Sequence, residues 1–309
     1  MERLEELKKR LKERSPELEL REREPMSRYT TFRIGGPAVL MALPRNMEQV
    51  QTVVREAKAL EVEPFFLGNG SNLLVADKGY SGFVVKLTGE FEEICFETAP
   101  KNGKPLLTAG GAVLLSKLSQ TALHWELTGL EFAQGIPGSV GGAITMNAGA
   151  YGGEISQNLI WVCGLDRNGE EQNFRASECD FSYRKSIFSG GGFLIVEALF
   201  QLEPGDPSAI KARMDQLAVQ RREKQPLEYP SAGSMFKRPP GYFAAALIDQ
   251  CGLKGFSVGG AQVSEKHAGF VVNRGGATCA DVLELVDQVK ERVLAQTGVE
   301  LEMEVKVLK

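Results

Sequence analysis

The feature that most constrains the fold is a glycine-dense stretch at residues 135–153, in a chain of 309 residues and 34 glycines. Glycine lets a backbone approach a flat or charged partner closely, but every glycine costs conformational entropy on folding. Apolar residues alternate with these glycines at Ile136, Val140, Ile144 and Met146. Because flexible Gly/Ser linkers lack such anchors, the stretch predicts an ordered backbone surface that lies against a ligand.

A shorter glycine loop, Gly68-Asn69-Gly70-Ser71-Asn72, follows an apolar run at residues 64–67. Its backbone amides could approach phosphate oxygens closely. A dinucleotide site of the Rossmann type is not indicated, because a strand-like Leu73-Leu74-Val75 follows instead of a helix and the third glycine is missing. From these residues alone the loop is either a phosphate-binding loop or a tight β-turn.

Two further segments place cations beside apolar residues. Arg184 and Lys185 lie between aromatic and aliphatic neighbours, where a desolvated arginine could stabilise developing negative charge. The same pattern also fits a surface arginine with a partly buried stem. Residues 231–240 set Ser234 near two cations, which would suit a phosphate, although such a Ser/Gly/Pro segment can equally be a plain turn.

The segment Gly255-Phe256-Ser257-Val258-Gly259 has the spacing of a hydrolase nucleophile elbow. The residues that follow it do not open a helix, and His267 lies only ten positions after Ser257, so the order of a catalytic triad is absent. His124 is the one other histidine in the chain. The sequence therefore predicts neither an esterase nor a metal site.

Charge and cysteine usage narrow the class of protein. With 36 basic and 40 acidic residues, the formal net charge is −4, which disfavours a nucleic acid or an anionic membrane as partner. No apolar run approaches the ~20 residues that span a bilayer, and no leader is evident, so a cytoplasmic protein is expected. The five cysteines are widely spaced, odd in number and without a CxxC pair, which predicts buried thiols in a reducing compartment: Cys95, Cys163, Cys179, Cys251 and Cys279.

Hydrophobic periodicity predicts three lobes of mixed helix and strand. The expected divisions are residues 1–88, 89–205 and 206–309. Helices are expected at residues 2–14, 47–60, 114–127, 206–224, 242–250 and 279–296. Strands are expected at residues 39–43, 64–67, 73–76, 83–87, 94–97, 106–109, 194–200, 268–273 and 301–307. The alternation predicts an α+β protein.

Taken together, these stretches resemble the UDP-N-acetylenolpyruvoylglucosamine reductase (MurB) family from about Thr30 to the C-terminus. The matching pieces are residues 30–36, 68–72, 135–149, 181–188, 231–239 and 259–273. The resemblance implies an FAD-binding fold of the vanillyl-alcohol-oxidase (PCMH) type in two lobes, with a C-terminal substrate-binding lobe. Residues 201–229 are short and helical, which indicates the shorter type without the extra tyrosine-bearing loop.

The resemblance also implies the chemistry. Non-covalent FAD would take a hydride from NADPH and pass it to the enolpyruvyl β-carbon of a UDP-linked amino sugar, in peptidoglycan precursor synthesis. Arg184, Ser234 and Glu304 match the catalytic residues, with Ser234 as the proton donor and Arg184 and a protonated or hydrogen-bonded Glu304 stabilising the enolate-like charge. No protein partner is implied.

The remaining site residues are carried over by position. Substrate contacts are expected from Tyr183, Lys237 and Arg238, of which Arg238 stands where many members carry asparagine. Lys237 is also expected to assist the proton donor. Cofactor contacts are expected from Arg33, Gly68, Asn69, Gly70, Ser71, Asn72, Gly135, Gly138, Ser139, Gly141, Gly142, Ala143 and Asn147.

Two rival functions fit parts of the sequence. A sugar or alcohol oxidase of the same fold often tethers its flavin through a histidine or a cysteine, but no histidine precedes Leu123. A nucleotide-sugar binding protein without catalysis is disfavoured, because Arg184, Ser234 and Glu304 are all present. A reductase is therefore the function that the sequence predicts.

Overall fold

The computed structural model describes residues 2–97 and 103–309. The chain forms two compact units, each assembled from three segments. Unit 1 comprises Met1–Glu22, Leu40–Asn69 and Gly82–Val219, and unit 2 comprises Arg23–Val39, Gly70–Ser81 and Gln220–Lys309. The lobe boundaries expected near residues 88 and 205 stay a prediction.

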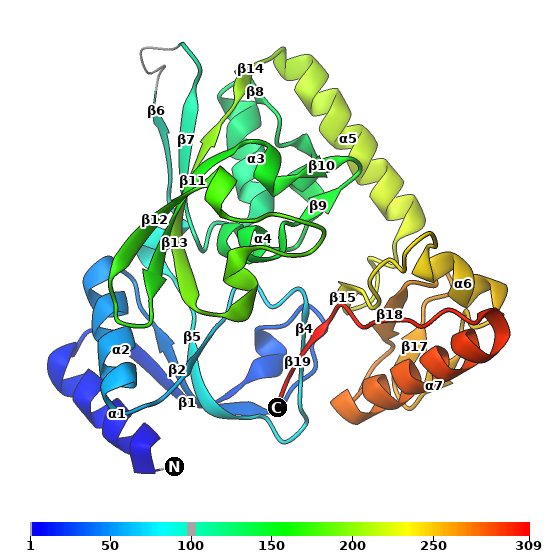
Figure 1. Cartoon of the computed structure of the whole chain (residues 1–309), viewed down its shortest axis with the longest axis horizontal. Coiled ribbons are helices and arrows are strands. Elements are labelled where there is room, and N and C mark those ends of the chain that lie inside the picture. The colour runs from blue at the N-terminus through cyan, green and yellow to red at the C-terminus, as the bar shows by residue number, and fades with distance from the viewer. Residues whose placement is uncertain (1, 98–102) are drawn as a thin grey trace. The chain divides into compact units, whose positions relative to one another are not determined.

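Unit 1 contains an antiparallel sheet of five strands in the order β12-β11-β13-β7-β6 (Figure 1). The strands are β6 Ile94–Glu97, β7 Leu106–Gly110, β11 Leu159–Asp166, β12 Glu171–Arg175 and β13 Phe193–Gln201. The helices α3 (Leu115–His124) and α4 (Val140–Met146) share one hydrophobic core with this sheet. Burial of these apolar side chains is the main force that holds the glycine-dense segment in an ordered conformation.

A second, four-stranded sheet has the order β1-β2-β5-β3. Its strands are β1 Glu19–Pro25, β2 Pro37–Leu43, β3 Pro64–Phe66 and β5 Tyr80–Val85, and β1, β2 and β5 each run from one unit into the other. Helix α1 (Glu2–Arg14) buries Leu4, Leu7 and Leu11 and contacts α2 (Met47–Ala59). The N-terminal helix expected from this leucine spacing is confirmed.

Unit 2 is built around the antiparallel sheet β15-β18-β17-β16 and helices α6 and α7. The elements are β15 Ser231–Ser234, α6 Ala244–Gln250, β16 Ser257–Val258, β17 Ala261–Val263, β18 Phe270–Asn273 and α7 Cys279–Thr297. Strand β4 (Leu73–Val75), which follows the short glycine loop, pairs in parallel with the C-terminal strand β19 (Lys306–Leu308). The long α5 (Pro207–Lys224) precedes this region in the chain.

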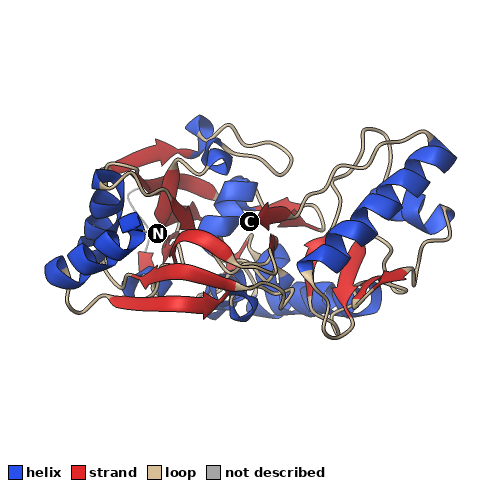
Figure 2. Ribbon diagram, turned by 90° about the horizontal axis from the view of Figure 1, so that it is seen from below, coloured by secondary structure: helices blue, strands red, loops and turns tan. Residues whose placement is uncertain are grey.

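Helices and strands are mixed throughout the chain, as expected for the α+β class (Figure 2). The remaining short strands are β8 Leu127–Thr128, β9 Gly149–Ala150, β10 Gly153–Glu154 and β14 Glu203–Pro204. Among the described residues, no helix is both long enough and apolar enough to cross a membrane.

Several sequence expectations need correction. Strands β1, β11 and β12 and helix α4 were not predicted. The strand expected at residues 301–307 begins only at Lys306, because the chain bends at Val305 between two different strand partners. The cysteines are not all buried, since Cys95 is exposed.

Candidate active site

The two glycine-rich segments lie side by side within unit 1. The side-chain amide of Asn69 donates a hydrogen bond to the carbonyl oxygen of Pro137, at 2.7 Å. A Cβ atom added at Gly68 would lie 2.8 Å from the Ser139 hydroxyl, so glycine is required for this approach. Ser139 is buried and caps α4 by accepting from the backbone N–H of Gly142. The structure therefore brings together Gly68, Asn69, Ser139 and Gly142, and their role in binding a cofactor stays a prediction.

The other end of the short loop belongs to unit 2. Gly70 has a φ of +60°, and any Cβ there would overlap the carbonyl oxygen of Tyr29. The Gly70 carbonyl accepts a hydrogen bond from Thr31, at 3.2 Å. Arg33, in the same neighbouring segment, is exposed and takes a left-handed conformation with a φ of +56°. These contacts join residues 30–36 to Gly70, so two of the segments expected to hold the cofactor lie together.

Some glycines of residues 135–153 serve packing within the protein. Gly141 donates its N–H to the carbonyl of Gly111 at 2.8 Å, and an added Cβ would lie 3.1 Å from that oxygen. Gly153 lies directly against the Phe132 ring. Gly135 and Gly138 precede α4, whereas Ala143 is a buried residue of the helix itself. The expectation that the whole stretch faces a ligand was therefore too broad, because part of it packs against the sheet.

Asn147 ends α4 in a left-handed conformation, with a φ of 44°, and its side chain is buried. Its amide nitrogen donates to a carboxylate oxygen of Glu154 at 2.9 Å and to the carbonyl of Ser182 at 3.2 Å. Its amide oxygen is buried and has no hydrogen-bond partner among the described residues. A buried orphan acceptor is costly, so this atom marks a place where a ligand donor would be stabilised.

Arg184 lies in a tight turn just after Ser182. The turn is closed by reciprocal backbone hydrogen bonds between Ser182 and Lys185, and Arg184 has a φ of +57°. The Arg184 guanidinium donates to the Gly149 carbonyl at 3.4 Å and stacks over the half-exposed Tyr183 ring, 5.1 Å from its centre. A non-glycine residue held at positive φ is uncommon and points to a constrained position.

Ser234 and Glu304 lie on neighbouring segments of unit 2. The Glu304 N–H donates to the carbonyl of Met235 at 2.8 Å, and Phe236 forms an antiparallel bridge with Met303. Ser234 ends β15 and is exposed, whereas Glu304 is partly buried. The predicted hydroxyl and carboxyl residues are therefore brought together by backbone pairing.

The two cationic residues expected to bind the substrate, Lys237 and Arg238, follow Ser234 closely in the chain. Lys237 donates its N–H to the Glu302 carbonyl at 2.9 Å, and its ammonium group pairs with the Glu302 carboxylate. Arg238 is exposed, and its guanidinium lies 4.7 Å from the centre of the Phe243 ring. Lys237 therefore has a carboxylate partner that sequence reasoning did not anticipate, since the two residues are far apart in the chain.

The buried thiols in the structure are expected to be unreactive at neutral pH. Burial raises the pKa of Cys163, Cys179 and Cys279 to about 11, so these thiols stay protonated at neutral pH. Within residues 2–97 and 103–309, no three His, Cys, Asp or Glu side chains are grouped so that they could hold a metal ion.

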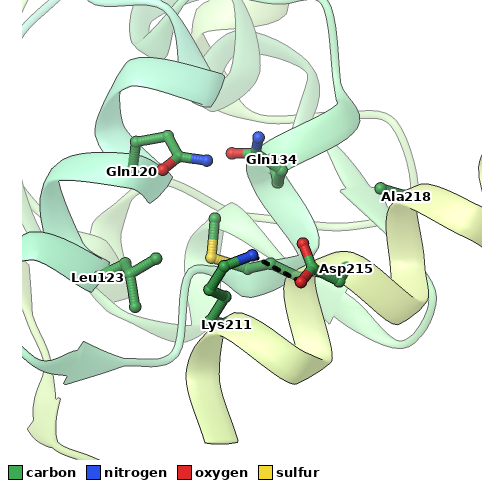
Figure 3. Close-up of a pocket in the computed structure, with 7 residues that line it drawn as sticks. Gln120, Leu123, Gln134, Lys211, Asp215 and Ala218 are labelled. Atoms are coloured by element: carbon green, nitrogen blue, oxygen red, sulfur yellow. Dashed lines mark hydrogen bonds and ion pairs between the residues drawn. The ribbon is translucent and has the colours of Figure 1, made fainter. Parts of the chain in front are cut away.

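A small pocket of about 90 Å³ lies elsewhere in unit 1 (Figure 3). It is lined by α3, α5 and the turn that carries Gln134. Two of the lining residues, Lys211 and Asp215, form an ion pair of 2.6 Å along α5. None of the predicted site residues lines it. Ligand sites for cofactors usually have volumes of roughly 300–1,000 Å³, so this pocket is not the candidate active site.

Comparison with known proteins shows which protein domains two parts of the chain resemble. Residues 38–175 match an FAD binding domain, and residues 225–308 match the C-terminal domain of UDP-N-acetylenolpyruvoylglucosamine reductase. The predicted FAD cofactor and the predicted FAD-binding α+β fold are confirmed by the first match and by a solved structure of this family. That structure, UDP-N-acetylenolpyruvylglucosamine reductase (MurB) from Thermus caldophilus, is 36% identical with a TM-score of 0.79, over 94% of this chain and 99% of that one.

Curated relatives agree over nearly the full length. The UDP-N-acetylenolpyruvoylglucosamine reductase of Agathobacter rectalis is 49% identical over 306 residues, which cover 97% of each chain. The enzyme of the same name from Clostridium novyi is 49% identical over 283 residues, covering 92% of this chain and 90% of its own. The chain therefore belongs to the UDP-N-acetylenolpyruvoylglucosamine reductase (MurB) family.

Proposed function

We propose that this chain reduces UDP-N-acetylglucosamine enolpyruvate to UDP-N-acetylmuramate, with FAD as cofactor and NADPH as electron donor. The observation that carries the proposal is 49% identity to a reductase of that name across 97% of both chains. The pairing of the segments that carry Ser234 and Glu304 supports the same activity. Residues 1–88 and 89–205 would hold the cofactor, residues 206–309 would hold the substrate, and the protein would act in the cytoplasm.

The residues present fit FAD. The close approach of Gly68 to the Ser139 hydroxyl brings the two glycine-rich segments together, and their backbone amides would suit a phosphate or a ring edge. The orphan amide oxygen of Asn147 would accept a hydrogen bond from a ring N–H. Arg33, Asn69, Gly70 and Ser71 would complete the contacts, together with Gly135, Gly138, Gly141, Gly142 and Ala143. When bound, FAD supplies two-electron chemistry that no side chain of the protein can provide.

Arg184 would stabilise the charge that develops during reduction of the double bond. Addition of hydride at the enolpyruvyl β-carbon leaves negative charge on the α-carbon and the adjoining carboxylate. A guanidinium held by Gly149 and Tyr183 needs little reorganisation to meet that charge. The constrained turn at Arg184 would therefore preorganise the site.

Ser234 would deliver the proton that completes the reaction. Proton transfer from its hydroxyl to the α-carbon saturates the carbon–carbon bond, and the hydroxyl would regain a proton from water or a neighbour. Glu304, on the adjoining segment, would stabilise the same charge by a hydrogen bond when its carboxyl is protonated. Lys237 forms an ion pair with Glu302. If Lys237 assists proton transfer from Ser234, the Glu302 carboxylate would therefore take part as well.

Tyr183, Lys237 and Arg238 would bind the rest of the substrate. Lysine and arginine are the usual partners of a diphosphate, and the exposed Arg238 side chain is available on the surface of unit 2. Phe243, which stacks with Arg238 and is 62% exposed, extends this surface with an aromatic ring. Binding away from the reacting carbons would supply the energy that orients them.

An anaerobic absorbance experiment tests the proposal. The purified protein should carry a flavin spectrum, and the colour should stay in the supernatant after denaturation and precipitation. NADPH should bleach it, and the enolpyruvyl sugar nucleotide should then restore the colour and yield a product heavier by two hydrogen atoms. A colourless protein that takes up no FAD, or a bleached protein whose colour returns only with oxygen, would overturn the proposal.

A further inference from the structure

Asn72 connects the short glycine loop to the segment that carries Glu304, within unit 2. Its side-chain amide donates a hydrogen bond to the Glu304 carbonyl oxygen at 3.1 Å. Its own carbonyl accepts from the Lys306 N–H at 3.2 Å, immediately before the parallel pairing of β4 with β19 begins at Leu73 and Lys306. Asn72 thus contacts the main chain on both sides of residue 305.

Glu304 lies where the chain changes from one strand partner to another. Met303 pairs with Phe236, next to the Ser234 segment, whereas Lys306 pairs with Leu73. Neither ladder includes Glu304 or the bend at Val305. The Glu304 N–H is held by Met235, and its carbonyl is held by Asn72. The Glu304 main chain is therefore held on one side by backbone pairing and on the other by a hydrogen bond from a side chain.

The segment that carries Asn72 is itself firmly attached to unit 2. Ala76 donates its N–H to the Leu308 carbonyl at 2.8 Å. The Asp77 carboxylate accepts from the backbone N–H groups of Cys279 and Ala280, at 2.7 and 3.0 Å, at the beginning of α7. A side chain on such a fixed segment can orient a neighbour, because little freedom remains to be lost.

Asn69 offers a contrast in the same loop. Its side-chain amide also donates to a carbonyl, but that carbonyl belongs to Pro137, in the glycine-dense segment of unit 1. The two asparagines therefore use the same kind of bond for different purposes. Asn69 joins the two segments proposed to hold FAD, whereas Asn72 joins one of them to a proposed catalytic residue.

We propose that Asn72 is a positioning residue, whose amide fixes the main chain at Glu304 and so directs the Glu304 carboxyl toward the reacting double bond. The inference rests on the proposed function and changes the expected role of Asn72 from cofactor contact to support of catalysis. Its failure would leave the family and the reaction untouched.

The test compares Asn72→Asp and Asn72→Ser with Asn69→Ala. Aspartate keeps the shape of asparagine but cannot donate to the Glu304 carbonyl when ionised, and serine is too short to reach it. FAD affinity of the apoprotein is measured by flavin fluorescence. The rates of bleaching by NADPH and of colour return with the enolpyruvyl sugar nucleotide are measured on FAD-saturated protein, the latter as a function of pH.

Both Asn72 variants should bind FAD and bleach as the wild type does, whereas colour return should be slower by about 10- to 100-fold, the usual cost of misplacing a catalytic group. Its pH profile should also shift, because the Glu304 carboxyl would sit in a changed environment. Asn69→Ala should instead weaken FAD binding, so the comparison separates loss of cofactor binding from loss of the chemical step.

Weaker FAD binding with an unchanged rate of colour return in the Asn72 variants would overturn the proposal and make Asn72 a cofactor contact. Loss of folding in both Asn72 variants would also overturn it, because the role of Asn72 would then be structural. If wild-type protein itself shows no colour return with the sugar nucleotide, the proposed function fails instead, and the two failures are distinguishable.

Discussion

The Arg184 turn of unit 1 and the Ser234–Glu304 pair of unit 2 are held in different ways. The turn is closed by its own backbone hydrogen bonds, but a buried side chain also contacts it from outside, since the Asn147 amide donates to the Ser182 carbonyl. Ser234 and Glu304 lie on segments joined mainly by backbone hydrogen bonds. Backbone pairing survives most substitutions, whereas a contact made by one buried amide is lost when that side chain is replaced. Substitution of Asn147 should therefore disturb the Arg184 turn, whereas the backbone pairing of the Ser234 and Glu304 segments should persist in most variants.

The largest effect is expected from removing the proton donor itself. Ser234→Ala should slow the return of flavin colour with the enolpyruvyl sugar nucleotide by about 10²- to 10⁴-fold, the usual contribution of a general acid, and leave bleaching by NADPH intact. Stopped-flow absorbance measures both steps. Ser231→Ala is the matched control in the same strand and should leave both rates close to wild type. Equal loss of both steps in Ser234→Ala would refute the proton-donor role.

Variants of Asn147 test the side-chain contact between α4 and the Arg184 turn. Asn147→Ala removes buried hydrogen bonds and places alanine at positive φ, so the free energy of unfolding should fall by about 2–4 kcal/mol. Asn147→Gly removes the same bonds without the steric cost and should be more stable than the alanine variant by about 1 kcal/mol. Denaturant unfolding measures both values. Equal stability of the two variants would mean that the left-handed conformation is not strained.

The pH dependence of the free energy of unfolding tests a histidine of unit 2 that is not one of the predicted site residues. Burial lowers the pKa of His267 below its ordinary value of 6.5. The unfolded chain therefore binds a proton more readily, so the stabilising effect is complete above about pH 6.5 and is lost as the pH falls through the lower, folded-state pKa. His267→Gln should lose less stability than wild type between about pH 7.5 and 5.5. Parallel pH curves for the two proteins would contradict this assignment.

The smallest expected effect concerns α7. The Thr278 hydroxyl caps this helix by accepting a hydrogen bond from the Asp281 N–H at 3.0 Å. In return, the Asp281 carboxylate accepts from the Thr278 N–H at 2.9 Å. Thr278→Ala should lower the free energy of unfolding by about 1 kcal/mol. Glu291→Ala, on the exposed side of the same helix, should change it by less than about 0.5 kcal/mol. A similar loss in both variants would show that the cap is not the cause.

Local signals in the sequence predicted much of the fold. The leucine spacing of α1 and the charged periodicity of α5 were sufficient for those helices. Helix α4 was missed because glycine is a poor helix former, and here the Ser139 cap and packing against the sheet override propensity. Strand β1 was missed because its residues, ELREREP, are almost all charged.

The candidate site was predictable only in part. Arg184, Ser234 and Glu304 were predicted through family motifs and stay a prediction, and the structure shows the approach of Gly68 to Ser139. The support of these residues by Glu154, Asn72 and Glu302 was not predictable, since each contact depends on tertiary folding. Polar side chains that hold a neighbour in place carry no local signature in a single sequence.

The most direct test of the proposed reaction follows the hydrogen atoms into the product. The protein is supplied with NADPH deuterated at the transferred position, in ordinary water, and the product is analysed by NMR. The account predicts deuterium at the β-carbon of the new lactyl group and ordinary hydrogen at the α-carbon. Deuterium at the α-carbon would contradict the proposed hydride acceptor and the role of Ser234 as proton donor.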